Sequence, residues 1–404
     1  MGSPTARRLM LVPARSGAEA SDRSCVQSPQ RPVAIEIVST LSGFTALESE
    51  WNALARRAAA PWQVFQDFSV LRHWAVAYAE EAGQPAIVVA RRNGRAAVIL
   101  PLVRRRRFGL AGLHLMGAPV ARFGDLLAED DADGALAAAL RAAIGTLDAD
   151  YLDAPLVRDD SALVRLGLDR GAIVVGRQQA PFADLARRVG PDGPGEIYAA
   201  KVRSNHRRRL RRMAEDGGIT LGDAGPGPEA VALVHRAIAM KKAWLLRENL
   251  AAPSVFDPRF EAFFARFAAE SGGLASLQVS TLARDGEAFA IDLSFDFKGH
   301  AFGHVIATGC DAEKDGAGGI LVHHVFANAK ARGNTIFELL TPSDEHKMRH
   351  ADGVTGVRDL LIPLSLAGRI GCETLLARGL PVAKAIAQRL PAGLARAIAL
   401  RTGY

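Results

Sequence analysis

The chain has 404 residues, 49% apolar and 23% charged, which gives room for two domains with sizeable cores and is ordinary for a soluble globular protein. Its net charge of +7 is modest for this length and arises mainly from two local clusters of basic residues, which favours a local anion site over a general nucleic-acid coat. The sequence contains no run of about eighteen uncharged apolar residues, so it predicts no membrane-spanning helix. The three cysteines are far apart without metal-ligand spacing, which is typical of reduced thiols in a cytoplasmic protein.

Residues 1–32 are rich in Ser, Arg, Pro and Gly without periodicity, and this composition predicts a flexible leader. An N-terminal domain is expected over residues 33–195. It begins with an alternating strand pattern, VAIEIVST, followed by two helical segments, TALESEWNALARRAA and DFSVLRHWAVAYAEEAG. The strands PAIVVARR and RAAVILPLV then meet at Asn93-Gly94, a strong indicator of a tight hairpin.

The same order of elements returns in residues 219–373, the predicted C-terminal domain. A strand, GITLGD, precedes two helical segments and a second hairpin, which turns at Asp285-Gly286. Gly94 and Gly286 are 192 positions apart, as are Phe68 and Phe260, and a constant offset across a helix and a hairpin indicates a duplicated fold. Each half continues as strand, helix, strand. The predicted fold class is therefore α/β, with two tandem domains that each contain a mixed, mostly antiparallel sheet flanked by helices.

A glycine-rich loop, EKDGAGGILV, lies between a strand and a helix of the second half. Glycines let a ligand approach the backbone, and the free N–H groups of a first helical turn favour phosphate. The residues expected to bind such a group are Gly316, Ala317, Gly318, Gly319 and Ile320. The first half carries five acidic residues before its corresponding helix, APVARFGDLLAEDDADG, so the pyrophosphate of a donor is expected in the second half only.

This unit, which ends with Gly333 after the helix, resembles the GNAT (N-acetyltransferase) fold. In that family a Gln/Arg-x-x-Gly-x-Gly/Ala loop binds the pyrophosphate of acetyl-CoA. Gly316 and Gly318 match the two glycines, and Leu321 matches the apolar residue that follows them. Glu313 stands where the family has Gln or Arg, which places a carboxylate near the phosphates.

Over residues 35–370 the chain further resembles the tandem-domain acetyltransferases of the CelD/BcsL type, named after cellulose biosynthesis and distantly related to Fem-type aminoacyltransferases. The stretches FQDFSVLRHWAVAY, VILPLVRRRRFG, RSNHRRRLRRMAEDGG and GNTIFELLTPSDEHKMRHADG carry this resemblance. It implies two GNAT-like domains, with acetyl-CoA or a longer acyl-CoA as co-substrate.

Acyl transfer to an amine needs a base and an acid but no covalent nucleophile. His304 is the candidate base, with Asp292 to orient it. A hairpin loop over residues 297–299 would place these two residues opposite each other, whereas a two-residue loop would pair Asp292 with Val305. In the alternative interpretation, both are ordinary polar residues of the sheet.

Asp344, His346, Lys347 and His350 follow the last strand of the repeated unit, at an edge of the sheet where sites commonly form. By resemblance, Lys347 matches a lysine that follows this strand in the related families, where Tyr precedes it; here the preceding residue is His346. Lys347 is predicted to be catalytic, and Asp344 and His346 to contact the acceptor. No zinc-ligand spacing is present, so no metal is predicted.

Residues 196–218 form a predicted basic linker helix with seven Lys and Arg between Lys201 and Arg212. Arg203 and Arg207 share one helical face and could bind an acidic or nucleotide-linked acceptor, because the planar guanidinium suits phosphate and carboxylate. A solvated face is the alternative. The helix lacks the interleaved aromatic residues of single-strand binding, which argues against nucleic acid except tRNA.

Residues 374–404 form a basic helical tail that could pack on its own protein, on a membrane surface or on a polysaccharide-synthase complex. The sequence favours an N-acyltransferase that acts on a small-molecule, lipid-linked or nucleotide-linked amine, such as a sugar or an envelope or exopolysaccharide precursor. The expected location is the cytoplasm or the inner face of the membrane. A Fem-type transferase that uses aminoacyl-tRNA and a non-catalytic partner of a polysaccharide synthase are the alternatives.

Overall fold

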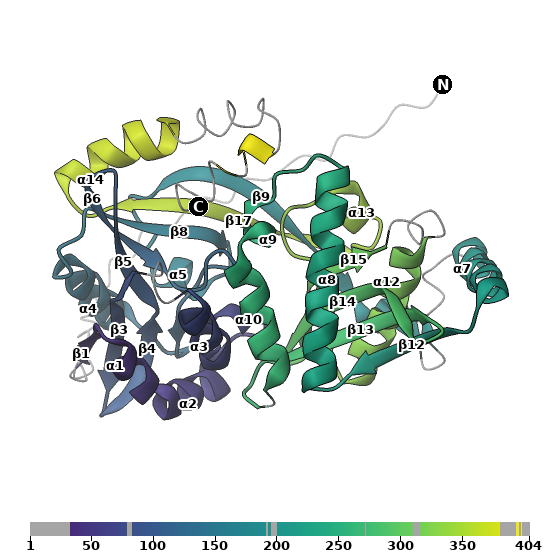
Figure 1. Ribbon diagram of the computed structural model, residues 1–404. Coiled ribbons are helices and arrows are strands. Elements are labelled where there is room, and N and C mark those ends of the chain that lie inside the picture. Colours follow the sequence, from purple (N-terminus) through teal and green to yellow (C-terminus); the bar gives the residue numbers. More distant parts are fainter. Residues whose placement is uncertain are drawn as a thin grey trace, which may run out of the picture.

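The computed structural model describes residues 33–78, 83–190, 193–194, 200–270, 272–309, 316–379, 393–395 and 397. The predicted leader, Glu313 and most of the predicted tail lie outside these ranges. Two α/β halves lie side by side, and long strands run across the middle of the molecule (Figure 1). The predicted fold class is confirmed: both halves are mixed, mostly antiparallel sheets flanked by helices.

The first half follows the order predicted from the sequence. Its helices are α1 (Leu41–Ala46), α2 (Glu48–Ala58), η1 (Val64–Gln66), α3 (Phe68–Ala77), α4 (Gly134–Gly145) and α5 (Ala162–Arg165). Its strands are β1 (Val33–Val38), β2 (Gln84–Pro85), β3 (Ile87–Arg92), β4 (Arg95–Leu100), β5 (Leu102–Arg107), β6 (Leu110–Leu115), β7 (Leu127–Ala128), β8 (Tyr151–Arg158) and β9 (Ile173–Asp184). Short elements then lead to the second half: α6 (Leu185–Arg188), β10 (Val189–Gly190), β11 (Gly193–Pro194), α7 (Ala200–Met213) and η2 (Ala214–Asp216).

The second half repeats the plan of the first. Its helices are α8 (Pro228–Arg247), α9 (Pro253–Phe256), α10 (Pro258–Ala269), α12 (Ala317–Ala331), α13 (Glu345–Met348), α14 (Leu366–Gly371) and η3 (Cys372–Gly379). Its strands are β12 (Ile219–Ala224), β13 (Ser276–Arg284), β14 (Glu287–Phe297), β15 (His300–Thr308), β16 (Ile336–Glu338) and β17 (Gly353–Pro363).

The hairpins β3–β4 and β13–β14 show the duplication at the level of the backbone. In both turns, Asn93-Gly94 and Asp285-Gly286, the two central residues are left-handed, as in a type I′ turn. The pairing shifts by one residue directly after Ala90 in the first hairpin and directly after Leu282 in the second, again 192 positions apart. The predicted repeat therefore extends to the position of a β-bulge.

The two halves exchange their last strands. β9, the end of the first half, lies between β16 and β17 of the second, and β17 in turn pairs with β8 of the first. The result is one eleven-stranded sheet in the order β12-β13-β14-β15-β16-β9-β17-β8-β6-β5-β2, with a separate four-stranded sheet, β1-β3-β4-β7. The sequence predicted two independent sheets, and the exchange joins them.

Helices cover both faces of the second half's sheet. α8 and α10 lie on one face, where phenylalanines of α10 (Phe263, Phe264 and Phe267) pack against Phe295 of β14. α12 lies on the other face, over a smaller core that includes Leu282. α10 also packs against its counterpart α3 of the first half, so the duplicated helices meet between the halves (Figure 1).

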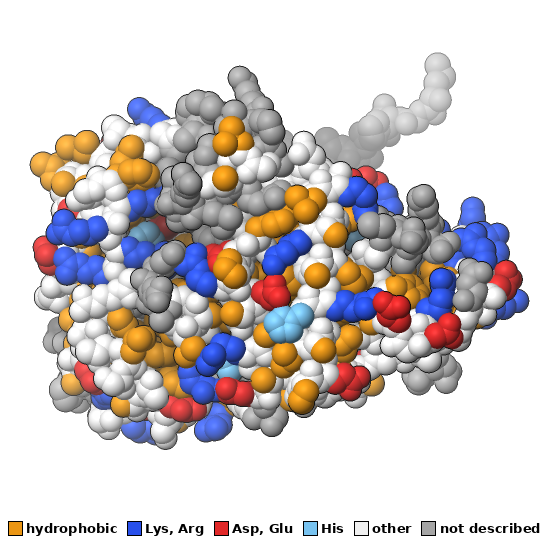
Figure 2. Space-filling model, viewed as in Figure 1, with side chains coloured by type: hydrophobic (Ala, Val, Ile, Leu, Met, Phe, Trp, Pro, Cys, Tyr) orange, Lys and Arg blue, Asp and Glu red, His pale blue; other side chains and the backbone are white. Residues whose placement is uncertain are grey.

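α7 lies at the far end of the second half, and Lys and Arg side chains gather there on the surface (Figure 2). The buried contact of this helix is made by Met213, which joins the core beneath α12. The predicted basic linker helix is thus present, with bounds Ala200–Met213.

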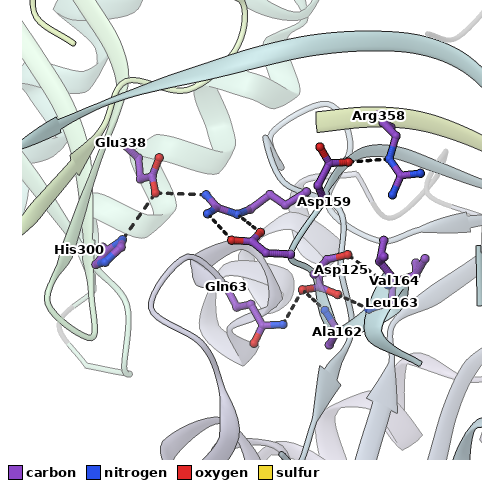
Figure 3. A network of polar contacts seen from close by, with 12 residues as sticks. Gln63, Asp125, Asp159, Ala162, Leu163, Val164, His300, Glu338 and Arg358 are labelled. Carbon is purple, nitrogen blue, oxygen red and sulfur yellow. Dashed lines mark hydrogen bonds and ion pairs between the residues drawn. The ribbon is translucent and has the colours of Figure 1, made fainter. Parts of the chain in front are cut away.

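A buried ion pair connects the halves near the exchanged strands (Figure 3). Arg158 Nη1, at the end of β8, lies 3.2 Å from Glu338 Oε1, at the end of β16, and both side chains are almost fully buried. Arg158 also binds Asp160 and lies over the Trp62 ring, while His300 lies 3.6 Å from the same Glu338 oxygen.

The register of β14 and β15 contradicts the predicted Asp292–His304 pair. The turn is Lys298-Gly299, a two-residue loop, and a bulge at His304, which has no partner on β14, then shifts the pairing so that Asp292 lies opposite Ile306. His304 contacts Phe295 and the phenylalanines of α10, whereas Asp292 lies in the layer beneath α12. The two side chains therefore face opposite sides of the sheet, and Asp292 cannot orient His304.

Asp292 belongs instead to a polar row between the sheet and α12. Asp223, Ser280 and Asp292 are directly opposite one another on β12, β13 and β14. Ser280 binds Asp223, which also accepts a hydrogen bond from Asn328 of α12. Asp292 Oδ1 is buried without a hydrogen-bond partner among the described residues. Burial raises the pKa of Asp292 to about 7, with a smaller contribution from the charge of Asp223.

Because the two halves exchange strands, we predict that they unfold in one transition. Glu338→Gln should lower the free energy of unfolding by about 3 kcal/mol, because it leaves the Arg158 guanidinium buried with less compensation. Urea unfolding followed by fluorescence and by circular dichroism measures this. Glu287→Gln, at an exposed ion pair with Arg236, is the control and should cost about 0.5 kcal/mol or less. Two separate transitions would show that the halves are independent.

We predict that ionisation of Asp292 makes the free energy of unfolding depend on pH. Because the folded state raises its pKa from about 3.9 to about 7, the protonated form is favoured in the folded state, and stability is lost as the pH rises between these values. Asp292→Asn should therefore match the natural protein near pH 4 and exceed it at pH 8, by on the order of 2 kcal/mol or more. Urea unfolding across this pH range tests the prediction.

Asp223→Asn is a control for which we expect the opposite pH dependence of stability. Burial opposes ionisation of Asp223, but hydrogen bonds from His324 and Ser280 lower its pKa overall, so its stabilising effect is present at neutral pH and lost in acid. An Asp292→Asn variant that is less stable than the natural protein at pH 8 would contradict the assignment.

Candidate active site

The parallel strands β15 and β16 separate after three residue pairs. Pairing joins His300–Phe302 to Ile336–Glu338, after which β16 ends while β15 continues to Thr308. No described strand pairs with this edge of β15 beyond Phe302. Backbone N–H and C=O groups on a free edge can bind an extended ligand.

The first turn of α12 lies close to the end of β15. Gly316 is its N-cap, with φ 76°, and no side chain among the described residues caps the helix. A Cβ at Gly318 would lie 3.6 Å from Thr308 Cγ2, which places the glycines against the last residue of β15. The free N–H groups of this turn and the positive end of the helix dipole suit a phosphate.

The corresponding helix of the first half, α4, differs at this point. The Asp133 side chain accepts hydrogen bonds from the N–H groups of Ala135 and Leu136, at 3.0 and 3.1 Å. A carboxylate thus occupies the place that a phosphate would take. Binding of a donor by the second half only stays a prediction.

α7 lies against the glycine turn of α12. A Cβ at Gly316 would overlap the Arg209 guanidinium, and one at Gly319 would lie 3.7 Å from His206 Nε2. His206 Nδ1 is 3.0 Å from His323 Nδ1 of α12. Burial lowers the pKa of His206, and it lowers the pKa of His323 to about 3, so both rings are neutral at physiological pH.

His304 lies at the bulge of β15, on the other face of the sheet. Its Nε2–H donates to the carbonyl of Val120, 2.8 Å away in the first half, and its Nδ1 is buried with no partner among the described residues. Burial lowers the pKa of His304 to about 3, and the charge of Arg122 lowers it further. The ring is therefore neutral, with the Nδ1 lone pair available.

Lys347 lies in α13, which follows β16. Its Nζ donates to the carbonyl of Leu340 at 3.1 Å. Burial lowers the pKa of Lys347 to about 8; Asp344 opposes this effect, and Arg122 and Lys241 add to it. The charge of Arg122 lowers the pKa of both Lys347 and His304.

The residues predicted to contact the acceptor lie at α13 and on α7. Asp344 caps α13 by accepting from the Lys347 N–H, 2.8 Å away, and His346 is exposed beside the His350 ring. On α7, Arg203 is half-buried and Arg207 is exposed. None of these observations tests their predicted contact with the acceptor.

The sequence did not single out three groups that the fold brings to the site. Arg209 and His206 are three positions apart on α7, and this spacing could have indicated a shared face toward the glycine loop. Arg122 lies in an irregular segment of the first half, and no local pattern relates it to His304 or Lys347. Among the described residues, no group of three or more His, Cys, Asp or Glu could hold a metal ion, and no helix could span a membrane.

Residues 200–348 match the family model of the acetyltransferase (GNAT) domain. No curated protein matches the chain. The solved structure of FemX aligns with a TM-score of 0.55 and 11% identity, over 81% of this chain and 98% of that one. The C-terminal domain of a protein assigned as a lysylphosphatidylglycerol synthetase from Agrobacterium fabrum aligns with a TM-score of 0.51 and 14% identity, over 82% and 97%.

At these identities the alignments show a shared fold, which extends over both halves. The narrower assignment comes from the family match, which covers β15, the glycine turn, α12 and Lys347. Residues 200–348 therefore form an acetyltransferase (GNAT) domain, and the protein is an acyltransferase.

Proposed function

We propose that the protein transfers an acetyl or longer acyl group from acyl-CoA to an amine held between its two halves. The observation that carries this proposal is the uncapped glycine turn of α12 at the end of the split between β15 and β16. Gly316, Ala317, Gly318, Gly319 and Ile320 would bind the pyrophosphate through backbone N–H groups, with Arg209 beside them.

The co-substrate supplies an acyl group activated as a thioester, and transfer to the amine forms an amide and releases a thiol. The free edge of β15 would position the acyl group, because its backbone groups are not used by β16. Lys347 would donate a proton to the departing thiolate, since a pKa of about 8 keeps it charged at neutral pH and makes it a usable acid. The proton lost by the amine would go to solvent, because a pKa of about 3 makes His304 too weak a base for this step.

Fem-type transfer from aminoacyl-tRNA is the second candidate. Exposed arginines of α7, including Arg207 and Arg208, lie on the helix that packs on the glycine turn, where they could contact a phosphate backbone. The amine acceptor would be the same in both cases. The CelD/BcsL resemblance extends the first candidate to a sugar or envelope precursor.

Calorimetry of the full chain with acetyl-CoA and several longer acyl-CoAs tests the donor site. Gly318→Glu should weaken binding at least about 100-fold, because a carboxylate would occupy the pyrophosphate position at the helix end. Ala331→Glu introduces the same charge at the other end of α12 and should bind as the natural protein does.

Absence of binding to every acyl-CoA would contradict the acyl-CoA proposal. Transfer activity with aminoacyl-tRNA that RNase abolishes would then support the second candidate.

A further inference from the structure

The turn between β5 and β6 carries a phenylalanine at a position that favours small polar residues. Arg107 pairs with Leu110, so the turn consists of Phe108 and Gly109, whose φ angles are 52° and 83°. In the described part of the chain, three other two-residue turns have the same left-handed conformation, and they begin with Asn93, Asp285 and Lys298. Asparagine and aspartate adopt this conformation at low cost, whereas a bulky side chain adopts it only under strain.

The Phe108 side chain faces solvent. It is 56% exposed, so contacts with the described residues do not offset the strain of its backbone. The Arg107 guanidinium lies over the ring, 5.2 Å from its centroid. A large aromatic side chain held in a strained and exposed position indicates contact with a partner.

A second apolar surface lies on the outer face of α14. Leu366 and Ile370 are four residues apart, and therefore on one face of the helix, and they are 75% and 57% exposed. The other face is buried: Gly368 packs against the backbone of Asp150, and Cys372 at the start of η3 is fully buried. Because the solvent face of a helix normally carries polar residues, two large apolar side chains on adjacent turns also indicate a partner.

One carboxylate joins the turn to the helix. Asp150 accepts a hydrogen bond from the Ala111 N–H of β6 at 2.8 Å, and another from the hydroxyl of Ser365, the N-cap of α14, also at 2.8 Å. Leu110, the first residue after the turn, lies so close to Gly371 that a Cβ there would overlap it. The Phe108 turn and α14 are therefore neighbours at one end of the first half (Figure 1).

This end of the molecule also carries positive charge. Four consecutive arginines, residues 104–107, end β5, and Arg106 and Arg369 are exposed. Asp148, an acid beside them, binds Arg104 at 2.8 Å. Figure 2 shows hydrophobic side chains at α14, at the upper left, with Lys and Arg side chains nearby. Large apolar side chains combined with arginines are the composition of a surface that binds anionic bilayers.

We propose that the Phe108 turn and the outer face of α14 bind the surface of a bilayer that contains anionic lipids. Phe108, Leu366 and Ile370 enter the layer between the headgroups and the acyl chains, and the arginines contact lipid phosphates. Nucleic acid would use the arginines but leave the apolar side chains in water, so a bilayer fits both features of the surface better. This docking does not depend on the proposed acyl transfer.

Co-sedimentation of the full chain tests the proposal, with vesicles of phosphatidylcholine alone and with added phosphatidylglycerol. Binding should require the anionic lipid and weaken as salt is added, because salt screens exposed charges. Phe108→Asn should weaken binding at least about tenfold through loss of apolar contact, and Arg106→Gln about fivefold through loss of one charge. Glu373→Gln, which removes an exposed acid of η3 three residues after Ile370, should strengthen binding about fivefold.

Controls separate docking from folding. Because asparagine suits a left-handed turn, Phe108→Asn should be at least as stable in urea as the natural protein, whereas a phenylalanine needed for folding would give a less stable variant. Phe108→Trp should retain vesicle binding. Leu246→Ser on α8 and Arg95→Gln at the β3–β4 turn remove an exposed apolar and an exposed basic side chain outside this surface, and both should bind vesicles as the natural protein does.

Absence of binding to the anionic vesicles would overturn the proposal, as would binding that Phe108→Asn leaves unchanged. Two other results would also overturn it: binding to RNA but not to vesicles, weakened by Arg106→Gln, and a dimer that requires Phe108 and does not bind vesicles. Calorimetry with acyl-CoA should give the same affinity for Phe108→Asn and the natural protein. Failure of acyl-CoA binding would contradict the proposed function alone.

Discussion

The exchange of β9 and β17 is the constraint on which the rest of the structure depends. Each strand completes the sheet of the other half, so neither half has its full set of strands alone. β9 and β17 pair over most of their length, and β16 is held against β9 by only three residue pairs. The position of β16, and with it the split from β15, is therefore set by a strand that belongs to the first half.

The two halves of the duplicated fold differ at the start of the helix that follows the sheet. In the first half the helix after the sheet begins with an aspartate cap, and in the second it begins with glycines. The loop of the first half that contains Val120 contacts β15 of the second half, where its carbonyl accepts a hydrogen bond from His304. One half would hold the donor, and the other would shape the place of the acceptor.

Some buried charged residues of this protein affect its stability, and others have a proposed role in its function. Arg158 and Glu338 compensate each other and connect the halves. Asp292 lies beneath α12 with a raised pKa and belongs to a polar row with Ser280, so its effect is on stability. Lys347 differs from both, because burial lowers its pKa to about 8 and so makes it a usable acid at neutral pH.

The sequence by itself determined the elements, their order and their repetition, because these depend on local chemistry. Asn93-Gly94 and Asp285-Gly286 fix hairpins through the left-handed conformation, and Gly333, with φ 92°, ends α12 as expected. The glycine loop could also be identified from the sequence, because it too depends on local chemistry. Only the tertiary structure decided the register of β14 and β15, since the two-residue turn at Lys298-Gly299 and the bulge at His304 place Asp292 opposite Ile306. It also decided the strand exchange, because the exchanged strands pair residues more than 150 positions apart and no local pattern encodes such distances.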